Sequence, residues 1–275
     1  MPDPRLTVMC HFRNEEVYLP YWLRHHARLF DHGIMIDYRS TDRSIDIIRA
    51  MVPTWEIRPT RNDMFYSVSI DREVMDIESG FDGWKMCLNV TEFVMHDNLK
   101  KFIAEFEQTH PSVLGLVTTG FIIQDAPDQV GVPLTDADLW DQRHFGCPEP
   151  DPFHGVTDRR RLLHKAAHGA YGIGRHSNSV SMLQEPPLYL FWYGWCPLEL
   201  KLQRNKSTKP MIPSSDWGSH HVRGEEEIRD IWRNKYLPRC GNLLDGRWPL
   251  LNDMVERLRR LSADGQSEGA SADQG

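Results

Sequence analysis

The sequence lacks any apolar run of the roughly 18 residues that a membrane-spanning helix needs. It also lacks a basic excess. The net charge of −7 and the sequence pI near 6.0 argue against a nucleic-acid binder that relies on a basic surface. The N-terminal segment has no charged stretch followed by an apolar stretch and a small-residue cleavage site, so we expect no secretion and a cytoplasmic protein without a transmembrane segment.

The sequence lacks any Cys-x-x-Cys pair. Its five cysteines are odd in number and widely scattered, so they suggest neither a zinc knuckle nor a disulfide framework. We expect reduced, buried thiols. The histidines show neither His-x-His nor His-Glu-x-x-His spacing, which speaks against a metal-dependent hydrolase.

The first 93 residues alternate between strand-like and helix-like patterns. Such alternation predicts an α/β fold, with a mostly parallel central sheet flanked by helices. We place Asn14 at the N-cap of the first helix and Gly33 at its end, and Asp71, Arg72 and Glu73 on the solvent-exposed face of the third. The expected strands are 6–12, 34–38, 55–58 and 84–93, and the second and third helices are 44–51 and 68–80.

The rest of the chain is less regular. A Pro-, Asp- and Gly-rich segment at 124–160 predicts either a functional lid or a plain surface loop. We expect a single domain over 1–263 and a disordered tail at 264–275, which is rich in Ala, Gly, Ser, Asp and Gln. The other expected elements are helices at 97–109, 224–235 and 247–262 and strands at 113–117 and 188–195.

The segment from Trp84 to Phe93 reads as a buried strand that ends in polar side chains. Apolar residues fill its first part, and Asn89, Thr91 and Glu92 gather at its C-terminal end. In open α/β sheets, ligand sites lie beyond the carboxyl ends of the strands, so these side chains are candidates for chemistry. The alternative is a strand that simply runs into a turn.

Three motifs in order resemble a known family. The first is Arg-Asn-Glu-Glu at 13–16, followed by Leu-Pro-Tyr-Trp-Leu and His-His at 19–26. The second is Asp-Tyr-Arg-Ser-Thr-Asp at 37–42, and the third is the segment 84–93. Together they resemble the family 2 glycosyltransferases of GT-A fold, in which the third motif reads Trp-x-x-x-x-Asp-x-Asp-Glu-Phe. The resemblance covers the first 93 residues.

The resemblance implies an enzyme that transfers a sugar from a nucleotide-diphospho-sugar donor to a glycan or other acceptor, in polysaccharide biosynthesis. Residues 1–96 would form the nucleotide-binding half and 97–263 the acceptor half. Asp42 would stabilise its turn, and for Arg72 a solvated helix face stays an alternative. By resemblance, the residues that contact the nucleotide sugar would be His11, Arg13, Asn14, Glu15, Asp37, Arg72, Asn89 and Thr91.

The chain departs from the family at the metal-binding aspartates, whose positions hold Asn89 and Thr91. Hard cations prefer anionic oxygen ligands, and only Glu92 remains charged. Three interpretations stay open. Mn²⁺ or Mg²⁺ could be held by Glu92 and His176. Basic groups could neutralise the diphosphate without metal. Activity could be lost, which would leave a catalytically inactive nucleotide-sugar-binding or scaffolding protein.

The resemblance also implies catalytic roles in the C-terminal half. There the family has a lysine followed about a dozen residues later by a histidine, which gives Lys165 and His176 catalytic roles beside Glu92, with Arg175 as added positive charge. A histidine taken singly is more often structural, and His220 and His221 compete for the same role. An inverting transfer needs a carboxylate base. Candidates by location alone are Glu149, Asp151 and Asp158.

Overall fold

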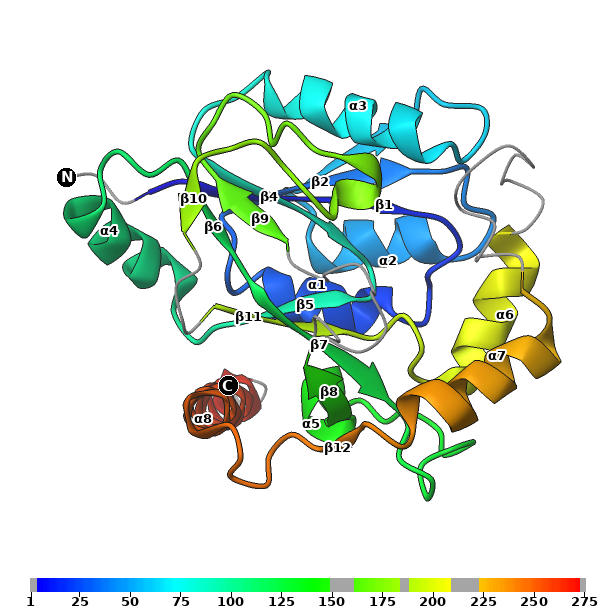
Figure 1. Ribbon diagram of the computed structural model, residues 1–275. Coiled ribbons are helices and arrows are strands. Elements are labelled where there is room, and N and C mark those ends of the chain that lie inside the picture. The colour runs from blue at the N-terminus through cyan, green and yellow to red at the C-terminus, as the bar shows by residue number, and fades with distance from the viewer. Residues whose placement is uncertain (1–3, 149–160, 184–187, 209–222, 273–275) are drawn as a thin grey trace.

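A computed structural model describes residues 4–148, 161–183, 188–208 and 223–272. Its larger sheet has seven strands within these ranges, in the order β10-β6-β9-β4-β1-β2-β3 (Figure 1). In this described sheet only β9 runs against the others. The strands are β1 (Leu6–Phe12), β2 (His32–Asp37), β3 (Glu56–Pro59), β4 (Trp84–Asn89), β6 (Gly115–Val117), β9 (Leu162–His164) and β10 (Met182–Leu183).

A smaller sheet lies beside the first and has five strands among the described residues, in the order β12-β8-β7-β11-β5. Its pairs are antiparallel except for β11 with β7. The strands are β5 (Glu92–Met95), β7 (Thr119–Gln124), β8 (Phe145–Pro148), β11 (Tyr189–Trp192) and β12 (Gly241–Asn242).

Helices cover both faces of the larger sheet (Figure 1). Met9, Ile34 and Cys87 form an apolar cluster with Val74 of α3 on one face, while Val8 and Cys10 face the main core with α1 and α2. The predicted fold class, a mostly parallel central sheet flanked by helices, is confirmed. The helices are α1 (Leu19–His26), α2 (Ser44–Met51), α3 (Ser67–Glu78), α4 (Leu99–Thr109), α5 (Leu139–Gln142), α6 (Leu198–Thr208), α7 (Glu225–Ile231) and α8 (Pro249–Ala272), with short turns η1 (Ile173–Arg175) and η4 (Trp232–Tyr236).

The segment 84–93 joins the two sheets. β4 ends at Asn89, Val90 and Thr91 turn the chain, and Glu92 begins β5 in the smaller sheet. The predicted single strand is therefore wrong at its end. Because the chain leaves one sheet for the other at this turn, the polar residues stand at the junction between the sheets and not on a surface loop.

α1 holds β5 in place through side chains on one face of the helix. Trp22 Nε1 donates to the Glu92 carbonyl at 3.0 Å. His25 Nε2 donates to the Val94 carbonyl at 2.7 Å, and the Val94 N–H donates to His26 Nε2 at 3.3 Å. The Trp and His-His of the first motif thus fix the backbone of the strand that carries Glu92.

Two predicted helix boundaries are wrong. Asn14 does not cap a helix, because its φ is 52° and its Oδ1 accepts from the Thr41 N–H at 2.8 Å, and α1 begins later, at Leu19. Gly33 does not end that helix but lies inside β2. A Cβ at Gly33 would lie 2.0 Å from the ring of Trp55, so the glycine is needed for this close packing.

The predicted exposed face of α3 is wrong for two of its three residues. Asp71 is 3% exposed and Glu73 is 5% exposed, and of the three only Arg72 is exposed. Buried carboxylates require partners. Glu73 accepts from Thr60 Oγ1 at 2.7 Å and from Asn62 Nδ2 at 2.6 Å, and the partners of Asp71 belong to the candidate site.

The C-terminal half also differs from expectation in places. The predicted disordered tail is helical up to Ala272, because α8 continues past residue 264. The segment 124–160 contains α5 and β8, and its part from 149 to 160 lies outside the described residues. Within the described ranges, none of the helices combines the length and apolar character that a membrane crossing requires.

Acidification is expected to destabilise the protein between about pH 6.5 and 4, because buried histidines stay neutral in the fold. Burial, opposed by Asp97, lowers the pKa of His96 to about 4. The unfolded chain therefore binds a proton first, and stability falls as the pH falls through this window. His96 alone contributes up to about 3 kcal/mol of this loss. Urea unfolding across the pH range measures it.

The variant His96→Asn tests whether His96 causes this loss of stability. The asparagine Oδ1 can still accept from the Asn98 N–H, as the Nδ1 of His96 does at 2.9 Å. We expect a shallower dependence of unfolding free energy on pH. His168→Asn, at an exposed histidine, is the matched control and should leave the slope unchanged. Equal slopes in all three proteins would contradict the role of His96.

Candidate functional site

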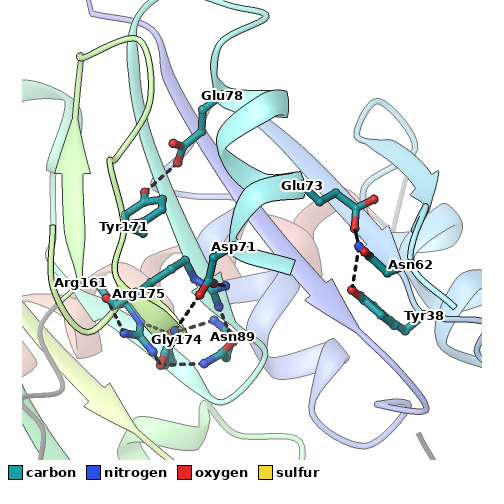
Figure 2. Close-up of polar contacts among 11 residues, drawn as sticks. Tyr38, Asn62, Asp71, Glu73, Glu78, Asn89, Arg161, Tyr171, Gly174 and Arg175 are labelled. Atoms are coloured by element: carbon teal, nitrogen blue, oxygen red, sulfur yellow. Dashed lines mark hydrogen bonds and ion pairs between the residues drawn. The ribbon is translucent and has the colours of Figure 1, made fainter. Parts of the chain in front are cut away.

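The carboxyl ends of β1, β2 and β4 meet at one edge of the larger sheet. His11 pairs in register with Asn89 on one side and with Ile36 on the other. The N-terminal half of α3 and the loop that contains η1 lie over this edge (Figure 2). Because ligands of open α/β sheets bind beyond the carboxyl ends of the strands, this edge is the candidate site.

Glu92 is the fully buried centre of the site, and both of its oxygens are occupied. Arg161 donates to it twice, from Nε at 2.8 Å and from Nη2 at 2.5 Å. Asn89 donates from its backbone N–H at 2.8 Å and from Nδ2 at 3.0 Å. A carboxylate offers about four lone-pair positions, so these hydrogen bonds use its whole capacity.

Arg175 completes the cluster from the η1 loop, and Figure 2 shows it pointing toward Asp71 and Asn89. Its Nη1 donates to Asp71 Oδ1 at 2.7 Å, and its Nη2 donates to Asn89 Oδ1 at 2.9 Å. The Gly174 N–H donates to Asp71 Oδ2 at 2.7 Å. The Arg175 carbonyl accepts from Arg161 Nη1 at 3.1 Å, which links the two arginines.

Two carboxylates of α3 hold the η1 loop in this position. Asp71 and Glu78 are two helical turns apart and therefore lie on the same face. Glu78 accepts from the Gly169 N–H and from the Tyr171 hydroxyl, each at 2.7 Å. The loop has a positive φ at Arg175, 59°, a conformation that costs a non-glycine residue roughly 1–3 kcal/mol. Strain of this kind gathers at functional sites.

The formal charges of the cluster cancel. Burial alone would raise the pKa of the Glu92 carboxyl, but Arg161 beside it holds that pKa below its usual range. Burial raises the pKa of Asp71 in spite of Arg175. Burial also opposes the charge of Arg175, yet its anionic neighbours raise its pKa. Two guanidinium groups and two carboxylates thus form a compact and neutral unit.

Three buried nitrogens at this edge have no hydrogen-bond partner among the described residues. They are His11 Nδ1, Arg13 Nε and Arg175 Nε. Burial, together with Arg175 and Arg161, lowers the pKa of His11 far below its usual value, so its ring is neutral. The rings of Tyr38 and Phe65 lie 6.1 and 6.0 Å from the His11 ring. An unpartnered buried polar atom costs about 1–3 kcal/mol, which a bound polar ligand would offset.

A cavity of about 200 Å³ adjoins the charged cluster. Arg161 and Arg175 form part of its wall, together with His176, Ser177 and Asn178 from the η1 loop. Whole-ligand pockets usually measure about 300–1,000 Å³, so this cavity has the size for one polar part of a ligand.

Residues of the first and second motifs serve mainly to hold the two βα loops and α6 in place. Arg13 Nη1 donates to the Tyr38 carbonyl at 2.7 Å. Asp37 Oδ1 accepts from the Ser40 N–H at 3.0 Å. Glu15 Oε1 pairs with Arg204 Nη2 of α6 at 2.6 Å.

Asp42 accepts from the N–H groups of Glu16 and Ser44, each at 3.0 Å. The prediction that Asp42 stabilises its turn is therefore confirmed.

The structure does not bring every predicted site residue together. Lys165 lies at the opposite end of the sheet, where Nζ bonds Glu107 Oε1 at 3.0 Å and stands 5.5 Å from the ring of Trp84. Arg72 is on the exposed side of α3. Thr91 is buried, and its carbonyl accepts from Tyr193.

His176 lines the cavity, whereas Glu92 is held within the cluster behind it. His220, His221, Glu149, Asp151 and Asp158 lie outside the described residues.

Two residues at this edge, Asp71 and Arg161, were not predicted as site residues. Asp71 is one position from Arg72, and its partners lie more than 100 residues away in sequence. Arg161 stands 69 residues after Glu92. The sequence held one local signal for Asp71. This residue interrupts the solvent-exposed face of α3, because the helix turn places it over the sheet.

A divalent cation does not fit the oxygens at the family's metal position. All four acceptor positions of Glu92 are used, and Asn89 Oδ1 already accepts from Arg175. The described residues contain no group of three or more His, Cys, Asp or Glu that could hold a metal ion. A cation at Glu92 would have to displace Arg161 and break both of its hydrogen bonds to the carboxylate, which is costly for a buried guanidinium.

No protein-family model matches the chain, and no curated protein matches it. Among solved structures, S. aureus TarS 1–349 aligns over 84% of this chain and 73% of its own, at 13% identity and a TM-score of 0.39. TarS 1–349 in complex with UDP aligns over 47% of this chain, at 15% identity and a TM-score of 0.32, and this chain covers only 38% of it.

A third solved structure is glucosyl-3-phosphoglycerate synthase from Mycobacterium tuberculosis, in complex with Mn²⁺, UDP and glucosyl-3-phosphoglycerate. It aligns over 47% of each chain, at 10% identity and a TM-score of 0.29. At these identities and TM-scores, the likenesses assign neither a family nor an activity to this chain.

Proposed function

We propose that this chain is a glycosyltransferase that binds a nucleotide-diphospho-sugar at the carboxyl ends of β1, β2 and β4. The observation that carries the proposal is the unpartnered nitrogens of His11, Arg13 and Arg175 at this edge. Polar groups that are buried without partners are few in native proteins, and several at one sheet edge indicate a polar ligand. The neutral ring of His11 suits a hydrogen bond to a base or ribose.

The second candidate is a nucleotide-sugar-binding protein without catalysis. The hydrogen bonding of Glu92 favours it, because a carboxylate whose oxygens are all occupied by Arg161 and Asn89 is not available to take a proton. Chemistry at this site therefore needs another base. Glu149, Asp151 and Asp158 remain proposals for that role.

Replacement of His11 by phenylalanine is expected to weaken nucleotide binding at least tenfold, because a planar aromatic ring stays and the Nδ1 hydrogen bond is lost. Tenfold corresponds to about 1.4 kcal/mol, within the range for one hydrogen bond. Calorimetric titration with UDP and with GDP measures the affinity. His168→Phe, at an exposed histidine, is the control and should bind as wild type does.

Turnover then separates the two candidates. Release of UDP or GDP from a panel of nucleotide sugars, with an acceptor glycan mixture present, supports the enzyme. Binding without release in any combination supports the binding protein. Failure of both UDP and GDP to bind, with or without Mn²⁺, would contradict the proposed function.

A further inference from the structure

The cluster of Arg161, Arg175, Asp71 and Glu92 differs from a metal site in its charge. A site built from carboxylates alone repels a diphosphate until a cation binds. Here the two guanidinium groups already neutralise the two carboxylates, at contacts of 2.5–2.8 Å. The cluster therefore presents no net negative charge to an approaching anion.

We propose that the cavity beside Arg161 and Arg175 holds the diphosphate of the donor, and that these guanidinium groups take the place of a divalent cation. This inference rests on the proposed function and specifies how that site recognises its ligand. Arg175 is only 5% exposed and lines the cavity, and within the described part of the chain its Nε has no hydrogen-bond partner. Planar guanidinium groups match phosphate oxygens better than ammonium groups do.

The scaffold keeps Arg175 in place before any ligand arrives. Asp71 and Asn89 fix its two terminal nitrogens through one N–H each, and its Nε has no hydrogen-bond partner among the described residues. Such preorganisation reduces the ordering cost of binding. Ser177 stands exposed at the same cavity and supplies a hydroxyl at its mouth.

Inorganic pyrophosphate is the probe, because it carries the diphosphate without base, ribose or sugar. We expect calorimetric binding in EDTA, in the absence of any divalent cation. Arg175→Lys should weaken this binding at least tenfold, since lysine keeps the charge but loses Nε and the planar fork.

A charge at the cavity mouth gives a test that leaves the buried cluster intact. Ser177→Asp should weaken pyrophosphate binding tenfold or more through repulsion. Ser179→Asp is the matched control, because Ser179 is also exposed but does not line the cavity, and it should bind as wild type does. If Arg175→Lys fails to fold, the comparison of Ser177→Asp with Ser179→Asp still tests whether pyrophosphate binds in the cavity.

Pyrophosphate binding that requires Mn²⁺ or Mg²⁺, or no binding in EDTA, would overturn the proposal. Equal effects of Ser177→Asp and Ser179→Asp would also overturn it. UDP or GDP binding that depends on His11 would in those cases leave the proposed function standing. If neither nucleotide binds under any condition, the proposed function fails, and this inference fails with it.

Discussion

Replacing Glu92 with glutamine is expected to lower the free energy of unfolding by about 3–5 kcal/mol. Glu92 is completely buried, and Arg161, which it neutralises, is 2% exposed. The glutamine side chain keeps the shape but removes the negative charge that Nε and Nη2 of the buried guanidinium contact at 2.8 and 2.5 Å. Removing one partner of a buried ion pair is costly for this reason, even where the pair itself adds little to stability.

Urea unfolding of a double-mutant cycle measures this effect. Arg161→Met should destabilise the protein to a similar degree, and the double variant should lose less than the sum of the two. Glu107→Gln is the matched control, because its pair with Lys165 is partly exposed, with side chains 31% and 23% accessible, and should cost less than about 1 kcal/mol. Additive effects of Glu92→Gln and Arg161→Met would show that the pair is not coupled.

Replacing Trp22 with alanine is expected to lower the free energy of unfolding by about 3–5 kcal/mol. The indole is fully buried in the main core, 4.3 Å from the ring of His26 and 6.2 Å from that of Trp55. Alanine would leave a cavity there and would remove the donor to the Glu92 carbonyl.

The variant Trp22→Phe separates the cost of losing side-chain volume from the cost of losing the Nε1 hydrogen bond. It keeps most of the apolar contact and loses the Nε1 donor, so we expect a cost of about 1–3 kcal/mol. The midpoint of urea unfolding for the two variants gives the comparison. If alanine and phenylalanine were equally destabilising, the hydrogen bond and not the packing would dominate at this position.

The sequence was sufficient to predict the framework because local patterns determine it. β1, α2 and α4 lie at or within two residues of the expected ranges, since apolar periodicity and turn residues are short-range signals. The first motif was less informative about structure. Its Asn14 suits a helix cap in isolation, but contacts with Thr41 from the next βα loop place it elsewhere.

The candidate site could be predicted only in part, because its partners meet through the fold. Asn89 and Glu92 stand in one motif, and their position at a sheet end follows from the strand pattern. Their partners Arg161 and Arg175 come 69 and 86 residues later, from segments without regular periodicity. Lys165 matches a family spacing, but β9 runs antiparallel to β4 and carries it to the other end of the sheet.

The outer strand β5 has a further consequence for how the protein behaves in solution. A strand with unpaired N–H and C=O groups is a template for pairing with another chain, and such edges promote aggregation. Here His25 and His26 occupy both backbone groups of Val94, so a second molecule finds no free ladder position at that residue. Protonation of His26 would remove the acceptor for the Val94 N–H. Acid that opens the contact between α1 and β5 would therefore expose a β-edge, and self-association would accompany acid unfolding.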